Sequence, residues 1–111
     1  MPSESEVESE AIGIDIGGTN LRAARVTAGG DILQWFAERT VADPPALIDR
    51  LVEMIDRLDG PDIGSVGIGV PGRVDALRGE VLSGGYVDLS TVPLASTLAA
   101  RTGKRIFVDN D

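Results

Sequence analysis

The chain has 111 residues, which suits one domain with a modest core, and its 42% hydrophobic content with 14 glycines is typical of a soluble α/β protein. Its net charge of −8 argues against a nucleic-acid-binding surface, because such surfaces are basic. No apolar run approaches the roughly 20 residues of a membrane helix and no signal peptide is recognisable, so we expect a cytoplasmic protein without membrane contact.

The first ten residues carry half of the net charge. They contain four glutamates and no cation, which leaves a net charge of −4 for residues 11–111. A segment rich in charge and poor in apolar residues cannot bury enough surface to fold. We therefore predict a disordered acidic leader over residues 1–10 and a single domain over residues 11–111. A functional acidic tail is the alternative interpretation of the leader.

Three strands and a helix are predicted in the first half of the domain. Residues 11–14, 21–27 and 32–39 have strand patterns, and a turn with two glycines at residues 28–31 joins the last two as a hairpin. Asp43 can then cap a helix whose first turn accepts the two prolines that follow it. Gly60 follows this helix, and its apolar residues recur at helical spacing: Leu47, Ile48, Leu51, Ile55 and Leu58.

A strand, a hairpin, a helix and a last strand are predicted in the second half. Residues 65–70 form a nearly continuous apolar run, the pattern of a strand that is covered on both faces. A small hairpin around residues 78–79 follows. A second helix begins at Pro93 and ends at Gly103, and residues 105–108 form the final strand.

Two helices that each lead into a strand imply right-handed crossovers and strands parallel to the first one. Ligands gather at the carboxyl ends of parallel strands in such sheets. Here those ends are Asp15 with the turn that follows it, Pro71-Gly72, and Asn110-Asp111. The sequence therefore predicts one site at which three distant segments converge.

The turn after the first strand, Asp-Ile-Gly-Gly-Thr-Asn, is typical of a nucleotide triphosphate site. Gly17 and Gly18 lack Cβ atoms, so backbone N–H groups can approach a phosphate closely and the chain can adopt turn angles that other residues resist. Thr19 can add a hydroxyl donor, and the carboxylate of Asp15 can hold a hydrated magnesium ion. A plain β-hairpin with a glycine turn is the alternative interpretation.

Residues 67–72 also satisfy the pattern G-x-G-x-x-G of dinucleotide-binding proteins. That function requires a helix to begin at the glycines, so that its N-terminus meets the pyrophosphate. Here the first two glycines lie inside a predicted strand and Pro71 interrupts the motif. No G-x-x-x-x-G-K-[ST] motif is present, which excludes a P-loop enzyme.

The β-β-β-α-β-α-β order resembles the ribonuclease H-like, actin-type ATPase domain of the actin/hexokinase/Hsp70 superfamily. Within it, GIDIGGTNLRAARV (residues 13–26), GIGVPGRVD (residues 67–75) and VDND (residues 108–111) resemble the ROK family of bacterial sugar kinases and sugar-responsive repressors. The resemblance implies an α/β fold with a mixed five-stranded sheet and a small hairpin insertion. It covers residues 11–111 as the N-terminal lobe, without the C-terminal lobe.

The resemblance implies an ATP-dependent, glucokinase-like sugar kinase of carbohydrate metabolism that uses Mg²⁺. Asp15 would orient the magnesium–ATP complex through water, and the transferring phosphates would be surrounded by Gly17, Gly18, Thr19 and Asn20. Gly72 would lie near the sugar, and Asn110 would hydrogen-bond a sugar hydroxyl. Asp111 would be the catalytic base. A carboxylate must fill this role because the chain has no histidine.

Several family features are missing from this segment. Residues 83–86 contain no asparagine, where kinases of the family often carry an Asn-rich sugar loop, so the sequence does not identify the sugar. The family's zinc motif lies beyond the equivalent of Asp111, and no cysteine or histidine is present, so this segment binds no zinc. Family members are often homodimers through the other lobe, which also supplies half of the cleft. We therefore expect this chain alone to be inactive and to leave an apolar face uncovered.

Two other functions are compatible with the sequence. One is a sugar-sensing ROK-type transcriptional regulator without its DNA-binding domain. The other is a noncatalytic actin-like ATP-binding module. The GGT turn and the VDND ending favour the kinase.

Overall fold

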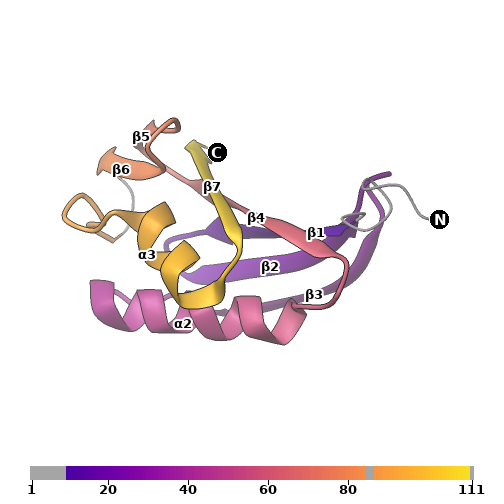
Figure 1. Ribbon diagram of the computed structural model, residues 1–111. Helices are drawn as coiled ribbons and strands as arrows, with labels where there is room; N and C mark the ends of the chain where they lie inside the picture. Colours follow the sequence, from indigo (N-terminus) through magenta and orange to yellow (C-terminus); the bar gives the residue numbers. More distant parts are fainter. Residues whose placement is uncertain (1–9, 85–86, 111) are drawn as a thin grey trace.

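The computed structural model describes residues 10–84 and 87–110 as a layered α/β domain (Figure 1). The predicted leader, apart from its last residue, and the predicted base Asp111 lie outside these residues. The elements in chain order are β1 (Glu10–Ile16), β2 (Asn20–Thr27), β3 (Ile32–Arg39), α2 (Pro44–Leu58), β4 (Ile63–Val70), β5 (Arg73–Asp75), β6 (Glu80–Ser83), α3 (Leu94–Thr102) and β7 (Arg105–Asn110).

The main sheet has five strands in the order β3-β2-β1-β4-β7. β1, β2 and β3 pair antiparallel, whereas β4 and β7 run parallel to β1, each after a helical crossover. The short strands β5 and β6 form a separate hairpin. The predicted α/β fold, its mixed five-stranded sheet and its hairpin insertion are thereby confirmed.

β1 begins one residue earlier than predicted. Glu10 belongs to the strand, where it pairs with Thr27 of β2, and its carboxylate forms an ion pair with Arg25. The predicted boundary of the acidic leader was therefore wrong at Glu10, because this glutamate has a cationic partner on the neighbouring strand.

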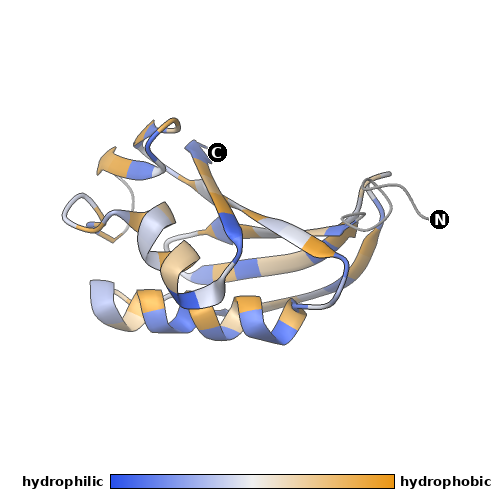
Figure 2. Ribbon diagram, viewed as in Figure 1, coloured by the Kyte–Doolittle hydropathy of each residue, from blue (hydrophilic) through white to orange (hydrophobic). Residues whose placement is uncertain are grey.

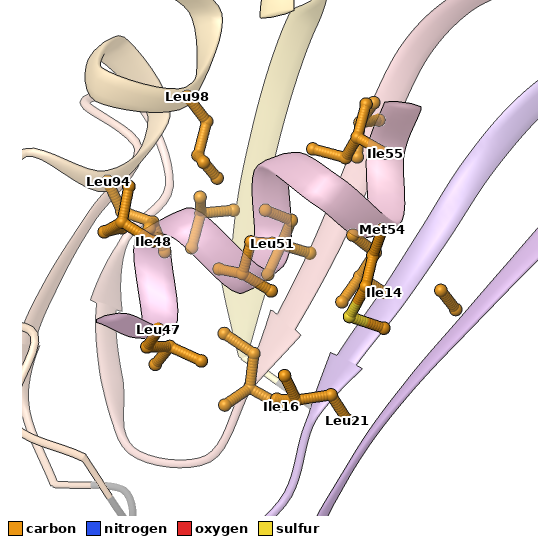
Figure 3. Packing of buried hydrophobic residues seen from close by; sticks show 14 of the residues in the cluster. Ile14, Ile16, Leu21, Leu47, Ile48, Leu51, Met54, Ile55, Leu94 and Leu98 are labelled. Carbon is orange, nitrogen blue, oxygen red and sulfur yellow. The ribbon is translucent and has the colours of Figure 1, made fainter. Parts of the chain in front are cut away.

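Both described helices lie on one face of the sheet (Figure 1). α2 begins at the predicted cap, where the Asp43 carboxylate accepts a hydrogen bond from the Ala46 N–H at 3.1 Å. Its apolar stripe alternates with polar residues (Figure 2) and turns Leu51 and Met54 toward Ile14 and Ile16 of β1 (Figure 3). α3 ends at Gly103, whose φ of 73° is the left-handed conformation that favours glycine.

The opposite face of the sheet is not covered by any described helix. Along β4 the side chains alternate: Val66, Ile68 and Val70 are buried, whereas Gly67 is exposed. The prediction that residues 65–70 are covered on both faces was therefore wrong. The positions on the second face include glycines, which have no side chain for a second layer to pack against. No described helix is both long and apolar enough to cross a lipid bilayer.

Candidate functional site

Three segments that are distant in sequence end at the same edge of the sheet. β1, β4 and β7 are parallel neighbours, so their carboxyl ends lie side by side, as the sequence predicted. Asp15 is in register with Gly69 of β4, which is itself in register with Asp109 of β7. The turn after β1, the turn after β4 and the end of β7 therefore form one continuous edge.

The glycine turn (residues 17–20) joins β1 to β2 as a tight hairpin. The Gly17 N–H donates a hydrogen bond to the carbonyl oxygen of Asn20 at 3.0 Å. A Cβ atom on Gly17 would lie 2.8 Å from that oxygen, so glycine is required by this close approach. Neither Gly17 nor Gly18 has a positive φ, so the expectation of unusual turn angles was wrong here.

Thr40, which follows β3, makes two further hydrogen bonds to the glycine turn. Its Oγ1 donates to the carbonyl oxygen of Gly17 at 2.7 Å, and its N–H donates to the carbonyl oxygen of Thr19 at 2.9 Å. Three carbonyl groups of the turn are thus occupied: those of Gly17, Thr19 and Asn20.

Other donors of the same turn are left free. Within the described residues, the N–H groups of Gly18 and Thr19 and the hydroxyl of Thr19 have no hydrogen-bond partner. Free N–H groups in a glycine-rich turn favour an anion. The structure is a β-hairpin, as the alternative interpretation proposed, but its unpaired donors give it the chemistry of an anion site.

A cavity of about 230 Å³ opens beside the glycine turn. Asp15 and Arg22, which are in register on β1 and β2, line it together with Gly17, Gly18, Thr19 and Asn20. The Asp15 side chain is exposed and makes no hydrogen bond or ion pair within the described part of the chain. A carboxylate and a guanidinium thus line the same cavity as a turn with free backbone donors.

The second half of the predicted site lies where β4 and β7 end. The Asn110 side-chain amide donates a hydrogen bond to the carbonyl oxygen of Gly72. Gly72 has φ +117°, and a Cβ atom there would lie 2.4 Å from the carbonyl oxygen of Ser83 and 3.0 Å from Gly84. Glycine is required at this position because the end of β6 crosses it.

Sequence reasoning missed two residues of this site. Arg22 was read only as part of a strand, although its alternation with the buried Leu21 could have placed it beside Asp15. Thr40 carries no local signal, since its contact with Gly17 joins residues 23 positions apart and depends on the pairing of β2 with β3. The G-x-G-x-x-G pattern of residues 67–72 does not form a dinucleotide-binding turn, as expected. Gly67 and Gly69 lie inside β4, and the hairpin strand β5, not a helix, follows.

The sequence and the fold are similar to those of known sugar kinases. A sequence model of the ROK family matches residues 11–111. The glucokinase of Thermotoga maritima is 38% identical in an alignment of 104 positions that covers 90% of this chain and 33% of that protein. An N-acetyl-D-glucosamine kinase of Escherichia coli is 37% identical in an alignment of 106 positions that covers 89% of this chain and 34% of that protein.

A solved structure extends the similarity to three dimensions. The ROK family glucokinase from Streptomyces griseus, in complex with glucose and AMPPNP, aligns with a TM-score of 0.83 at 33% identity, covering 91% of this chain and 33% of that one. The chain spans about a third of the length of the curated relatives that it matches.

Proposed function

Because the chain belongs to the ROK family, we propose that it is the N-terminal lobe of an ATP-dependent sugar kinase that transfers the γ-phosphate of ATP to a hydroxyl of a hexose. The relatives named above are kinases of glucose and of N-acetyl-D-glucosamine. Residues 11–111 would supply the phosphate side of the cleft and the carboxylate that acts on the sugar. Other parts of the whole protein would bind adenine and most of the sugar.

The observation that carries this proposal is the hydrogen-bonding state of the glycine turn. Three of its four carbonyl groups accept a hydrogen bond from Thr40 or Gly17, while the N–H groups of Gly18 and Thr19 have no partner within the described residues. Two free N–H donors favour a polyphosphate chain, and the three engaged carbonyl oxygens are not available to repel it. Arg22 adds a positive charge on the cavity wall, which is favourable beside a triphosphate.

Asp15 is suited to an ion that is held mainly by water and phosphate. Mg²⁺ in kinases is bound through one or two carboxylates plus substrate oxygens and keeps several waters. The described residues contain no group of three or more side chains that could hold a metal, but Asp15 is an unpaired carboxylate that lines the cavity. When bound, the ion would neutralise charge on the phosphates.

On the sugar side, Gly72 and Asn110 are proposed to bind the substrate and Asp111 to act as the base. The hydrogen bond from Asn110 to Gly72 holds the two segments together at the end of the sheet, which supports a shared role. Asp111 would accept the proton of the sugar hydroxyl. The hydroxyl oxygen would attack the γ-phosphorus as the bond between this phosphorus and ADP breaks. Positioned acid–base groups contribute about 10²- to 10⁴-fold to such rates.

A chimeric enzyme tests this proposal directly. Residues 10–111 would be joined to the part of the Thermotoga maritima glucokinase that follows its matching segment, and ADP release would be measured with glucose and Mg–ATP. We expect sugar-dependent turnover that falls by about 10²-fold or more in Asp111→Asn. Asp109→Asn, which alters an exposed carboxylate two positions away, is the matched control and should keep most of the activity. Equal activity of Asp111→Asn and the parent chimera would contradict the assignment of the base.

The 111-residue chain by itself should bind Mg–ATP weakly and phosphorylate no sugar, because half of the proposed cleft is missing. The uncovered sheet face supports this interpretation, since Trp35 and Phe107 are 66% and 58% exposed on it. We expect the chain to bind anilinonaphthalene sulfonate and the chimera to bind much less, because a returning C-terminal helix would cover this face. Robust sugar phosphorylation by the chain alone would overturn the lobe assignment.

A further inference from the structure

Thr40 is the single residue outside the glycine turn whose side chain is bonded to it within the described part of the chain. From this geometry we infer that Thr40 is a positioning residue, which holds the carbonyl groups of Gly17 and Thr19 toward the protein so that the Gly18 N–H remains available to a polyphosphate. The inference rests on the proposed function, because it assigns Thr40 to the same phosphate site.

The two hydrogen bonds of Thr40 act on different parts of the turn. Its N–H extends the β2–β3 ladder by one step, to the carbonyl oxygen of Thr19. Its hydroxyl crosses to the carbonyl oxygen of Gly17, at the start of the turn, over a distance of 2.7 Å. Any residue except proline could supply the first bond, but the second requires a side chain with a donor, which here is the hydroxyl of Thr40.

The occupied carbonyl of Gly17 matters because a peptide group has two ends. The carbonyl of Gly17 and the N–H of Gly18 belong to the same planar peptide unit. A hydrogen bond that holds this oxygen toward Thr40 therefore also holds the Gly18 N–H in the opposite direction, on the side away from Thr40. Without the hydroxyl, this unit could rotate and turn a carbonyl oxygen toward the phosphate, which would repel it.

The chain offers a matched control for this hydroxyl. Thr102 also donates its Oγ1 to a backbone carbonyl, that of Leu98, at 2.8 Å, and it is partly buried like Thr40. It lies at the end of α3 and does not line the cavity beside the glycine turn. Thr40→Val and Thr102→Val thus each remove a hydroxyl that donates to a backbone carbonyl, one at the turn and one elsewhere. Thr102→Val also removes the acceptor of the Lys104 N–H, so it perturbs the chain at least as much as Thr40→Val.

The experiment is a titration of the 111-residue chain, labelled with ¹⁵N, with Mg–ATP, magnesium tripolyphosphate and adenosine. In the wild-type chain we expect both phosphate compounds to shift the amide signals of Gly18 and Thr19, and adenosine to leave them in place. Thr40→Val should weaken binding of both phosphate compounds about three- to tenfold, the range of one hydrogen bond to a positioned group. Thr40→Ser should restore the wild-type affinity, and Thr102→Val should not change it.

The outcomes separate the two proposals. A wild-type chain whose turn signals do not move with either phosphate compound contradicts the proposed function, and the role of Thr40 falls with it. A wild-type chain that binds, together with a Thr40→Val variant that binds equally well, overturns the inference alone. A parallel loss of affinity and of urea resistance in both valine variants would also overturn it, because the effect would then be one of general stability.

Discussion

The two faces of the sheet are built by the same strands but have opposite character. One row of register partners faces the helices, the covered row: Phe36, Ala23, Ile14, Ile68 and Val108. An adjacent residue on each strand belongs to the other face. These residues form the open row: Trp35, Ala24, Gly13, Gly67 and Phe107. Every member of the open row is thus the sequence neighbour of a member of the covered row.

The difference between these rows shows which residues the described fold explains. Ile14 and Ile68 fill space beneath the helices and are almost completely buried. On the open face, a Cβ atom added to Gly13 or Gly67 would meet nothing within 4 Å. Packing within the described residues therefore requires the isoleucines but does not require the glycines.

The largest expected effect is on the covered face. Leu51 of α2 is fully buried against the sheet, and Leu51→Ala should lower the free energy of unfolding by about 3 kcal/mol, because it removes transfer energy and leaves a cavity. The matched control is Leu33→Ala on β3, where the side chain is 51% exposed, and we expect a loss below about 0.5 kcal/mol. Urea unfolding measures both. Equal losses would show that the burial of Leu51 stabilises the fold no more than an exposed leucine does.

Much of this arrangement could be predicted from the sequence. The third strand was predicted with the observed bounds, Ile32–Arg39, because the turn with two glycines that precedes it is a local signal. The start of α2 could be predicted from Asp43 and the prolines after it, since capping is also local. The convergence of Asp15, Gly72 and Asn110 followed from the crossover rule, which links distant segments through topology.

The remaining features depend on contacts between residues that are far apart in the sequence, which local patterns do not predict. The glycines of β4 read as part of an apolar run, so the sequence did not distinguish a strand covered on both faces from one with an uncovered face. The bond from Thr40 to Gly17 depends on the register of three strands. The close approach of Gly72 to Ser83 depends on how the hairpin folds back on β4.

An intermediate effect is expected at the start of the helix that covers the sheet. Asp43→Ala removes the side-chain acceptor of the Ala46 N–H and should lower the free energy of unfolding by about 1 kcal/mol. Asp31→Ala, in the turn between β2 and β3, is the control: its N–H bonds to Thr27 Oγ1, but its side chain has no partner within the described residues. Its effect in the same urea titration should stay below about 0.5 kcal/mol. A loss at Asp43 no greater than that at Asp31 would mean that the cap does not stabilise α2.

The smallest effect has the opposite sign and concerns the open row itself. Gly67→Ala adds a methyl group where the backbone is an ordinary strand and nothing lies within 4 Å, so the main consequence is a smaller loss of chain entropy on folding. We expect the free energy of unfolding to rise by about 0.5 kcal/mol. The control on the covered face is Ala23→Gly, which removes a buried methyl group and should lower it by about 1 kcal/mol. A loss of stability in Gly67→Ala would show that some part of this chain already occupies the space above Gly67.

In the chimera described above, by contrast, the same substitution should lower stability if a helix packs closely on these glycines. The sign of one substitution, compared between the chain and the chimera, therefore tests whether the open face is covered in the whole protein.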